Sequence, residues 1–257
     1  MRWINGEWDL HQKFSGTYSG ELPEWQRIAF ELLAETLGDD ADTFPCIPGR
    51  QAFLTDQLRI AFAGDPRENR TAEELAPLLA EYGKISRDTG KYASLVVLFD
   101  TPEDLAEHYS IEAYEELFWR FLNRLSHQDE KEWPEDIPAD PEHYKWEFCF
   151  DGEPYFLLCA TPAHEARKSR SFPFFMITFQ PRWVFEDLNG STAFGRNMSR
   201  LIRSRLEAYD QAPIHPQLGW YGGKDNREWK QYFLRDDEKQ VSKCPFSYLK
   251  NMFNKMK

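Results

Sequence analysis

Apolar residues recur every three to four positions in three long segments of the chain, which is the period of an amphipathic helix. The segments are residues 23–38, 111–125 and 195–209, and the last of them carries a basic opposite face. Gly38 closes the first segment, as glycine commonly does at the end of a helix. Another helix is expected to begin within residues 101–104, because a proline followed by two acids suits a first turn.

Three other segments have weaker or mixed patterns. Thr71 and Glu74 have the spacing of a capping box, which predicts a helix from Thr71 to about Tyr82. Two prolines in the motif FPCIPGR at 44–50 predict a loop, because the residue before a proline disfavours helical geometry. Residues 51–63 fit a helical and an alternating period, so both assignments stay open.

Short apolar runs and one turn signal predict a sheet. An Asp-Gly pair at 151–152 lies between two apolar runs, which is typical of a β-hairpin. The expected strand segments are 91–99, 145–150, 155–160, 172–179 and 182–185. Their order favours an α+β fold, with a mainly antiparallel sheet flanked by helices. Because no repeat or flexible linker divides the sequence, residues 1–257 are predicted to form a single domain.

Composition narrows the classes of function. The chain has 31 Lys and Arg against 43 Asp and Glu, a net charge of −12, and nucleic-acid binding needs a basic face instead. No apolar run approaches the ~20 residues of a membrane-spanning helix. The N-terminal MRWINGEWDL is too polar for a secretion signal. We therefore expect a cytoplasmic protein with reduced cysteines and with neither nucleic acid nor membrane as a partner.

Residues 213–237, PIHPQLGWYGGKDNREWKQYFLRDD, form the most irregular part of the chain. The first half has neither a helical nor a strand period, yet it is rich in aromatic residues. Such loops are where binding and catalytic sites are often built. This segment is therefore the first place to look for a site.

Two cysteines are candidate metal ligands. Cys46 lies in the proline-flanked loop, where a thiolate could ligate haem iron. Cys244 is followed by a proline, which removes one competing backbone donor. The alternative for both is a buried structural thiol.

Two histidines have distinct settings. His164 is followed by Arg167 and Arg170 in a basic run that could bind a carboxylate or a haem propionate, although a solvated turn is the alternative. His215 lies between prolines in a rigid loop, where one ring nitrogen could bind a metal. A hydrogen-bonded loop histidine explains the same pattern.

Several long motifs together resemble the bacterial YqcI/YcgG family. They are FPCIPGR at 44–50, PAHEARKSRSFP at 162–173, QPRWVFEDL at 180–188, the segment at 213–237, and Cys244 with the proline and phenylalanine that follow. Members of this family with an assigned activity are haem-dependent N-oxygenases that act on a guanidine nitrogen of L-arginine or a related amino acid. The resemblance thus implies haem b, an amino-acid substrate, and O2 with an electron-transfer partner, or peroxide.

The resemblance also implies roles for particular residues. The axial iron ligand is expected to be Cys46, with His215 second and Cys244 third. Arg167, Arg170 or Arg182 would hold the substrate carboxylate. A carboxylate would position the guanidinium and accept its proton. The residues expected at this cleft are Asp225, Asn226, Glu228 and Trp229, with Asp236 and Asp237 nearby.

Two other functions fit the same sequence. One is a haem-binding or haem-sensing protein that does not turn over substrate. The other is a metal-free module that binds a small molecule, in which residues 213–237 serve as a structural lid.

Overall fold

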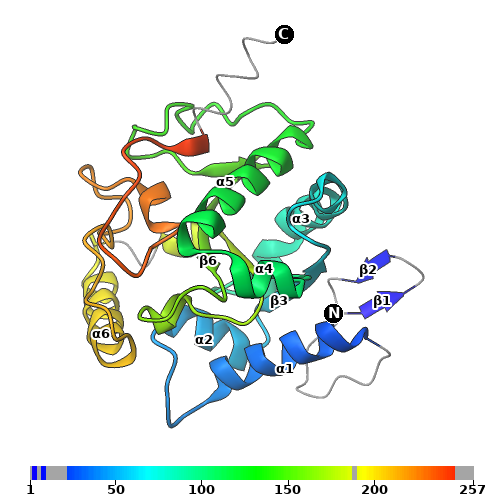
Figure 1. The fold of residues 1–257 in the computed structure, drawn as a ribbon. Coiled ribbons are helices and arrows are strands. Elements are labelled where there is room, and N and C mark those ends of the chain that lie inside the picture. Colours follow the sequence, from blue (N-terminus) through cyan, green and yellow to red (C-terminus); the bar gives the residue numbers. More distant parts are fainter. Residues whose placement is uncertain (1, 5–6, 10–21, 187–189, 247–257) are drawn as a thin grey trace.

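A five-stranded mixed sheet forms the centre of the described part of the chain (Figure 1). The computed structural model describes residues 2–4, 7–9, 22–186 and 190–246. The strands, in their spatial order, are β3 (Leu58–Ala63), β4 (Ser94–Phe99), β7 (Met176–Pro181), β6 (Glu153–Ala160) and β5 (Phe148–Phe150). β3 and β4 pair in parallel, and the other neighbours are antiparallel. The predicted α+β fold with a mainly antiparallel sheet is therefore confirmed.

Helices surround this sheet (Figure 1). They are α1 (Glu24–Gly38), α2 (Ile47–Leu54), α3 (Asn69–Thr89), α4 (Glu103–His108), α5 (Ile111–His127) and α6 (Ala193–Tyr209). A separate antiparallel hairpin joins β1 (Arg2–Ile4) and β2 (Glu7–Asp9). Within the described ranges, none of the helices is both long enough and apolar enough to cross a membrane.

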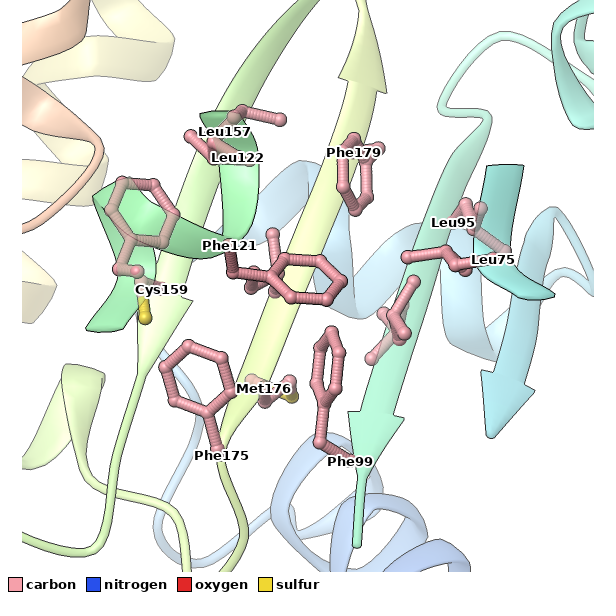
Figure 2. Close-up of a cluster of buried hydrophobic side chains, with 14 of the residues drawn as sticks. Leu75, Leu95, Phe99, Phe121, Leu122, Leu157, Cys159, Phe175, Met176 and Phe179 are labelled. Atoms are coloured by element: carbon pink, nitrogen blue, oxygen red, sulfur yellow. The ribbon is translucent and has the colours of Figure 1, made fainter. Parts of the chain in front are cut away.

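The two faces of the sheet receive alternate residues of each strand. On one face, Leu95 and Phe99 of β4 pack with Phe121 of α5 and Leu75 of α3, as Figure 2 shows. On the other face, Val96 of β4 points toward the side covered by α1 and α2. The first face is the solid apolar core, and the second face holds the cavity described below.

Local signals placed several elements correctly. The helices expected at 23–38, 111–125 and 195–209 are α1, α5 and α6. The Asp151-Gly152 hairpin is also present: both residues have positive φ, 49° and 81°, as a two-residue turn of this kind requires. A short strand-to-strand connection with this geometry fixes the pairing of β5 with β6.

Two predictions about helix starts were wrong. The motif at 44–50 is not a loop throughout, because α2 begins at Ile47 and tolerates Pro48 in its first turn. Thr71 does not cap a helix: α3 begins at Asn69, and the Thr71 hydroxyl donates to the carbonyl of Asp65 at 2.6 Å. α3 also continues to Thr89, well beyond the expected end.

The strand expected at 182–185 was also wrong. β7 ends at Pro181, and the residues Arg182–Phe185 form a 3-10 turn. A proline has no backbone N–H to continue the ladder, which is why the strand ends there. Positions 187 and 188 of the motif at 180–188 lie outside the described residues.

Candidate functional site

A cavity of ≈ 200 Å³ lies on the face of the sheet opposite α3 and α5. Its walls come from β6, β7, the start of α2, the inner side of α6, and the segment from residue 218 to 231. The apolar lining includes Phe156, Leu158, Phe185, Met198, Ile202 and Leu206. Segments that are far apart in the sequence therefore meet at one partly open, mostly apolar space.

The apolar side of helix α6 lines this cavity. Gly195 is the one fully buried residue of the helix, although Met198, Ile202 and Leu206 form a regular apolar side. These side chains face the cavity and do not pack closely against the sheet. The space thus has an apolar wall on each side, which suits a flat apolar group.

Cys46 contributes a sulfur to this cavity. It is the N-cap residue of α2, and its sulfur lies close to the backbone of Gly49 without a capping hydrogen bond. A Cβ on residue 49 would lie 3.2 Å from Cys46 Sγ, so glycine keeps this space open. Burial raises the pKa of the Cys46 thiol, while the Gly49 N–H and the charge of Arg170 oppose that rise. The sulfur is thus neutral in the free protein and already has partners that would stabilise a thiolate.

Arg170 places a positive charge in the cavity wall. It is buried and donates to the carbonyl oxygens of Tyr232 at 3.2 Å and Gln231 at 3.1 Å. Burial lowers its pKa to about 10, so it remains cationic at neutral pH. The backbone bonds fix this charge in position.

Glu228 places a carboxyl group in the same cavity. Its Oε1 accepts from Gly222 N at 2.8 Å and from Asn226 Nδ2 at 2.9 Å, and its Oε2 accepts from Gln231 Nε2 at 2.8 Å. Burial raises the Glu228 pKa to about 8, and the charge of Glu147 adds to the rise. Glu228 therefore carries a proton at neutral pH until a cation approaches it.

Glu147 and Tyr221 form a partly buried pair beside the cavity that no sequence motif predicted. The Tyr221 hydroxyl, which lines the cavity, donates to Glu147 Oε1. Burial raises the pKa of Glu147 to about 7, and Arg182 Nη1 lies 3.7 Å from its Oε2. A lone acid within the apolar run at 145–150 was the signal that could have found this residue.

Side chains of the basic run that begins at His164 make hydrogen bonds within the fold. His164 Nδ1 hydrogen-bonds with Thr161 Oγ1 at 2.8 Å and Nε2 with the Leu234 carbonyl at 2.9 Å. Burial lowers the pKa of His164 to about 4, so it is neutral. Arg167 donates to the carbonyls of Arg235 and Pro213 at 3.0 and 3.1 Å. Neither side chain lines the cavity, in contrast to Arg170 from the same run.

Acids of the chain complete this network. Asp236 accepts hydrogen bonds from the backbone N–H groups of residues 165, 166 and 167 at 2.8–2.9 Å. Although burial opposes it, these donors lower the pKa of Asp236. Asp210 accepts from Ser169 N and Oγ at 2.7 and 2.8 Å. The carboxylates bound by this segment are therefore those of Asp236 and Asp210, which belong to the same chain.

His215 and Trp229 belong to a second, much smaller cavity of ≈ 10 Å³. His215 Nδ1 accepts from Gln217 N at 3.2 Å, while its buried Nε2 has no hydrogen-bond partner. Burial lowers the pKa of His215 to about 4. Cys244 lies in the apolar core with 1% exposure. Of the three candidate iron ligands, Cys46 alone lines the large cavity.

 The remaining candidates lie outside the large cavity. Asp225 is exposed to solvent, and it does not line the cavity. Arg182 donates to the Lys145 carbonyl at 3.0 Å and lies beside Glu147, also away from the cavity lining. Asn226 contacts the cavity only indirectly, through its hydrogen bond to the Glu228 carboxyl group. In the part of the chain that the structure describes, no three His, Cys, Asp or Glu side chains converge on a common metal position.

Comparison with known proteins places the chain. The sequence model of the YqcI/YcgG family matches residues 33–247. The chain belongs to this family. The YqcI/YcgG match therefore spans Cys46, Arg170 and Glu228, the three polar groups described above in the cavity.

Relatives of this YqcI/YcgG chain differ in their sequence identity to it. YcgG of Bacillus subtilis (strain 168) is 98% identical over 92% of this chain and 94% of its own length. YqcI of the same organism is 69% identical over 91% and 92%. A protein of Streptomyces lavendulae named "Putative N(omega)-hydroxy-L-arginine synthase DcsA" is 34% identical over 89% and 86%. No solved structure matches the chain significantly.

Proposed function

We propose that this protein is a haem-dependent N-oxygenase that hydroxylates a guanidine or amine nitrogen of L-arginine or a related amino acid. The observation that carries the proposal is that one cavity holds both the Cys46 sulfur and the Glu228 carboxyl group. The name of the Streptomyces lavendulae relative supports an arginine substrate. Electrons would come from a reducing partner, or peroxide would replace O2 and electrons together.

The residues present fit haem b. Cys46 supplies a sulfur at the start of a helix, where the Gly49 N–H would stabilise the bound thiolate. Apolar side chains of β6 and α6 would contact the two faces of the macrocycle. Arg203 of α6 adds a second cation to the lining, suitable for a propionate. When bound through a thiolate, haem supplies O2 activation, because the thiolate favours O–O cleavage.

Glu228 would position the nitrogen that reacts. A guanidinium is always protonated in water and is then a poor nucleophile. Near such a cation, Glu228 would lose its proton from Oε2 to solvent and bind the guanidinium as a carboxylate. Asn226, Gln231 and the Gly222 N–H hold both of its oxygens in place. The same carboxylate can then accept a proton from the reacting nitrogen.

Arg170 would bind the carboxylate of the amino acid. It is the one of the three arginines expected for this role that lines the cavity. Its charge is fixed by bonds to backbone carbonyls, so it would orient the substrate relative to Glu228. Two opposite charges in one apolar space select a substrate with a carboxylate at one end and a cation at the other.

The iron ligand can be tested by absorption. With haem bound, the ferrous–CO complex of the native protein should absorb at about 450 nm, the thiolate signature in general haem chemistry. The Cys46→Ser variant should lose this band, whereas Cys244→Ser, its matched control in the core, should keep it. A native band at about 420 nm would contradict cysteine ligation and favour His215. His215→Ala is the variant that would then identify the ligand.

Turnover needs a separate test. With L-arginine and either peroxide or O2 plus reductant, mass spectrometry should detect the N-hydroxylated product. Glu228→Gln should abolish product, while Asp225→Asn, an exposed neighbour, should not. Haem binding with the expected band but no product from any guanidine or amine would contradict the oxygenase and leave a haem-sensing protein. A chain that stays colourless with added haemin would leave only the metal-free binding module.

A further inference from the structure

The outer side of α6 exposes two large apolar side chains to solvent. Phe194 and Leu201 are 47% and 50% exposed, and they lie seven positions apart, on the same side of the helix. They are two of the four large apolar residues exposed in the described part of the chain. A third, Trp220, belongs to the segment that lines the cavity. This side of α6 is therefore unusually apolar for a solvated surface.

The same side of α6 is basic, in a chain with a net charge of −12. α6 contains four arginines and one glutamate. Arg200 and Arg205 flank Leu201, and neither has a hydrogen-bond or ion-pair partner among the described residues. Near the start of α6, Lys91 Nζ lies 5.2 Å from the centroid of the Phe194 ring. Exposed apolar groups beside Arg200 and Arg205 favour an acidic protein partner.

The position of α6 connects this surface to the cavity. Its inner side chains, Met198, Ile202 and Leu206, line the cavity wall. A helix is ~10 Å across, so a partner on the outer side would lie about one helix diameter from the cavity. That distance suits electron delivery from a carrier on the outer side to a group in the cavity.

We propose that the outer side of α6, defined by Phe194, Leu201, Arg200 and Arg205, docks an acidic one-electron carrier protein of the iron–sulfur or flavin class. This inference rests on the proposed function. Hydroxylation of one N–H by O2 consumes two electrons and two protons and releases one water. The carrier is oxidised by one electron at each of two successive encounters, and solvent supplies the protons.

Binding is the first test. An acidic plant-type [2Fe–2S] ferredoxin is titrated into the haem-loaded protein by calorimetry at about 0.02 M and about 0.5 M salt. Arg200→Glu/Arg205→Glu should weaken binding by about tenfold or more at low salt and remove most of the salt dependence. The control, Arg70→Glu/Lys84→Glu, makes the same charge change on exposed positions of α3. It should change the affinity by about twofold or less.

Turnover separates this inference from the proposed function. With ferredoxin, its reductase and O2, the α6 double variant should form product at about a tenth of the native rate. With peroxide, native protein and variant should form product equally, because no carrier is needed. Product in neither arm, with binding intact, would overturn the oxygenase and leave the docking surface standing.

Other outcomes would overturn the docking surface itself. One is an equal loss of affinity in the α3 control, which would show a diffuse charge effect. Another is native affinity in the α6 double variant. A third is self-association of the acidic chain, seen by sedimentation and abolished by the α6 charge reversal, without ferredoxin binding. That result would assign the surface to a second copy.

Discussion

The two faces of the sheet use the same strands in different ways. On the face toward α3 and α5, Phe99 and Phe121 meet at a ring-centroid distance of 4.9 Å, and apolar side chains fill the space (Figure 2). On the face toward α6, Phe156 and Leu158 of β6 face a cavity. Protein interiors are normally close-packed, and the cavity face departs from that packing. One face holds the packed core, and the other holds the candidate site.

The largest expected effect tests the filled face. Phe121→Ala removes a ring with 0% exposure and should lower the free energy of unfolding by about 4 kcal/mol, because a cavity replaces packed atoms. Phe156→Ala, the same change on the half-buried cavity face, should cost less than half of that. Urea denaturation of both variants measures the difference. Equal losses would mean that the two faces are equally packed.

A pH profile tests the buried carboxyls of the cavity face. Burial raises the Glu228 pKa to about 8, and in the unfolded chain it is about 4.3, so its stabilisation is complete below pH 4.3. This stabilisation is lost progressively as the pH rises from about 4.3 through about 8, by on the order of 5 kcal/mol in total. Glu147, raised to about 7, adds to the fall. Urea denaturation between pH 5 and 9 should show this decline.

The Glu228→Gln variant sharpens the same profile. Its decline with pH should be much smaller, since the amide does not ionise. At pH 5 it should be less stable than the native protein by about 1 kcal/mol, because an N–H replaces one acceptor. The two stability curves should therefore cross below pH 8. Parallel curves would assign the pH dependence to other groups.

Two cysteine variants compare the two faces of the sheet, with smaller expected losses of stability. Cys244→Ser buries a hydroxyl in the apolar core and should cost about 2 kcal/mol. Cys46→Ser faces the cavity and should cost less than about 1 kcal/mol without haem. Thermal unfolding of the haem-free proteins measures both. A larger loss of stability in Cys46→Ser than in Cys244→Ser would indicate that the Cys46 thiol contributes mainly to the stability of the fold.

The smallest effect is expected on the outer side of α6. Leu201→Ser should change stability by less than about 0.5 kcal/mol, because half of the side chain is in solvent. The same variant should still weaken ferredoxin binding, by loss of apolar contact. A stability loss of about 2 kcal/mol or more would mean that Leu201 packs inside the fold, and the docking surface would lose its apolar part.

Local patterns recovered most elements but not their exact limits. α5 and α6 were found because their apolar periods extend over four turns or more. α2 was missed, because prolines in the motif at 44–50 outweighed the helix that begins at Ile47. The ambiguity at 51–63 had a simple origin: the end of α2 and the strand β3 share that stretch.

The candidate site was recovered in part. Cys46, Arg170, Asn226 and Glu228 were among the residues named from the sequence, and they meet at the cavity or support it. His164 and Arg167 have their polar atoms bound within the fold, which no local pattern reveals. Glu147 was missed because its partner Tyr221 lies far away in the sequence.

The sequence by itself determined the fold class, the helices with regular periods, the hairpin at Asp151-Gly152 and the family. These depend on local periodicity, turn chemistry and shared motifs, which are properties of contiguous residues. Tertiary structure alone decided which candidate residues share a cavity. Strand alternation and the path of residues 218–231 bring Cys46, Arg170 and Glu228 together across the chain. Burial, which sets the pKa of Glu228, exists only once those distant segments have packed.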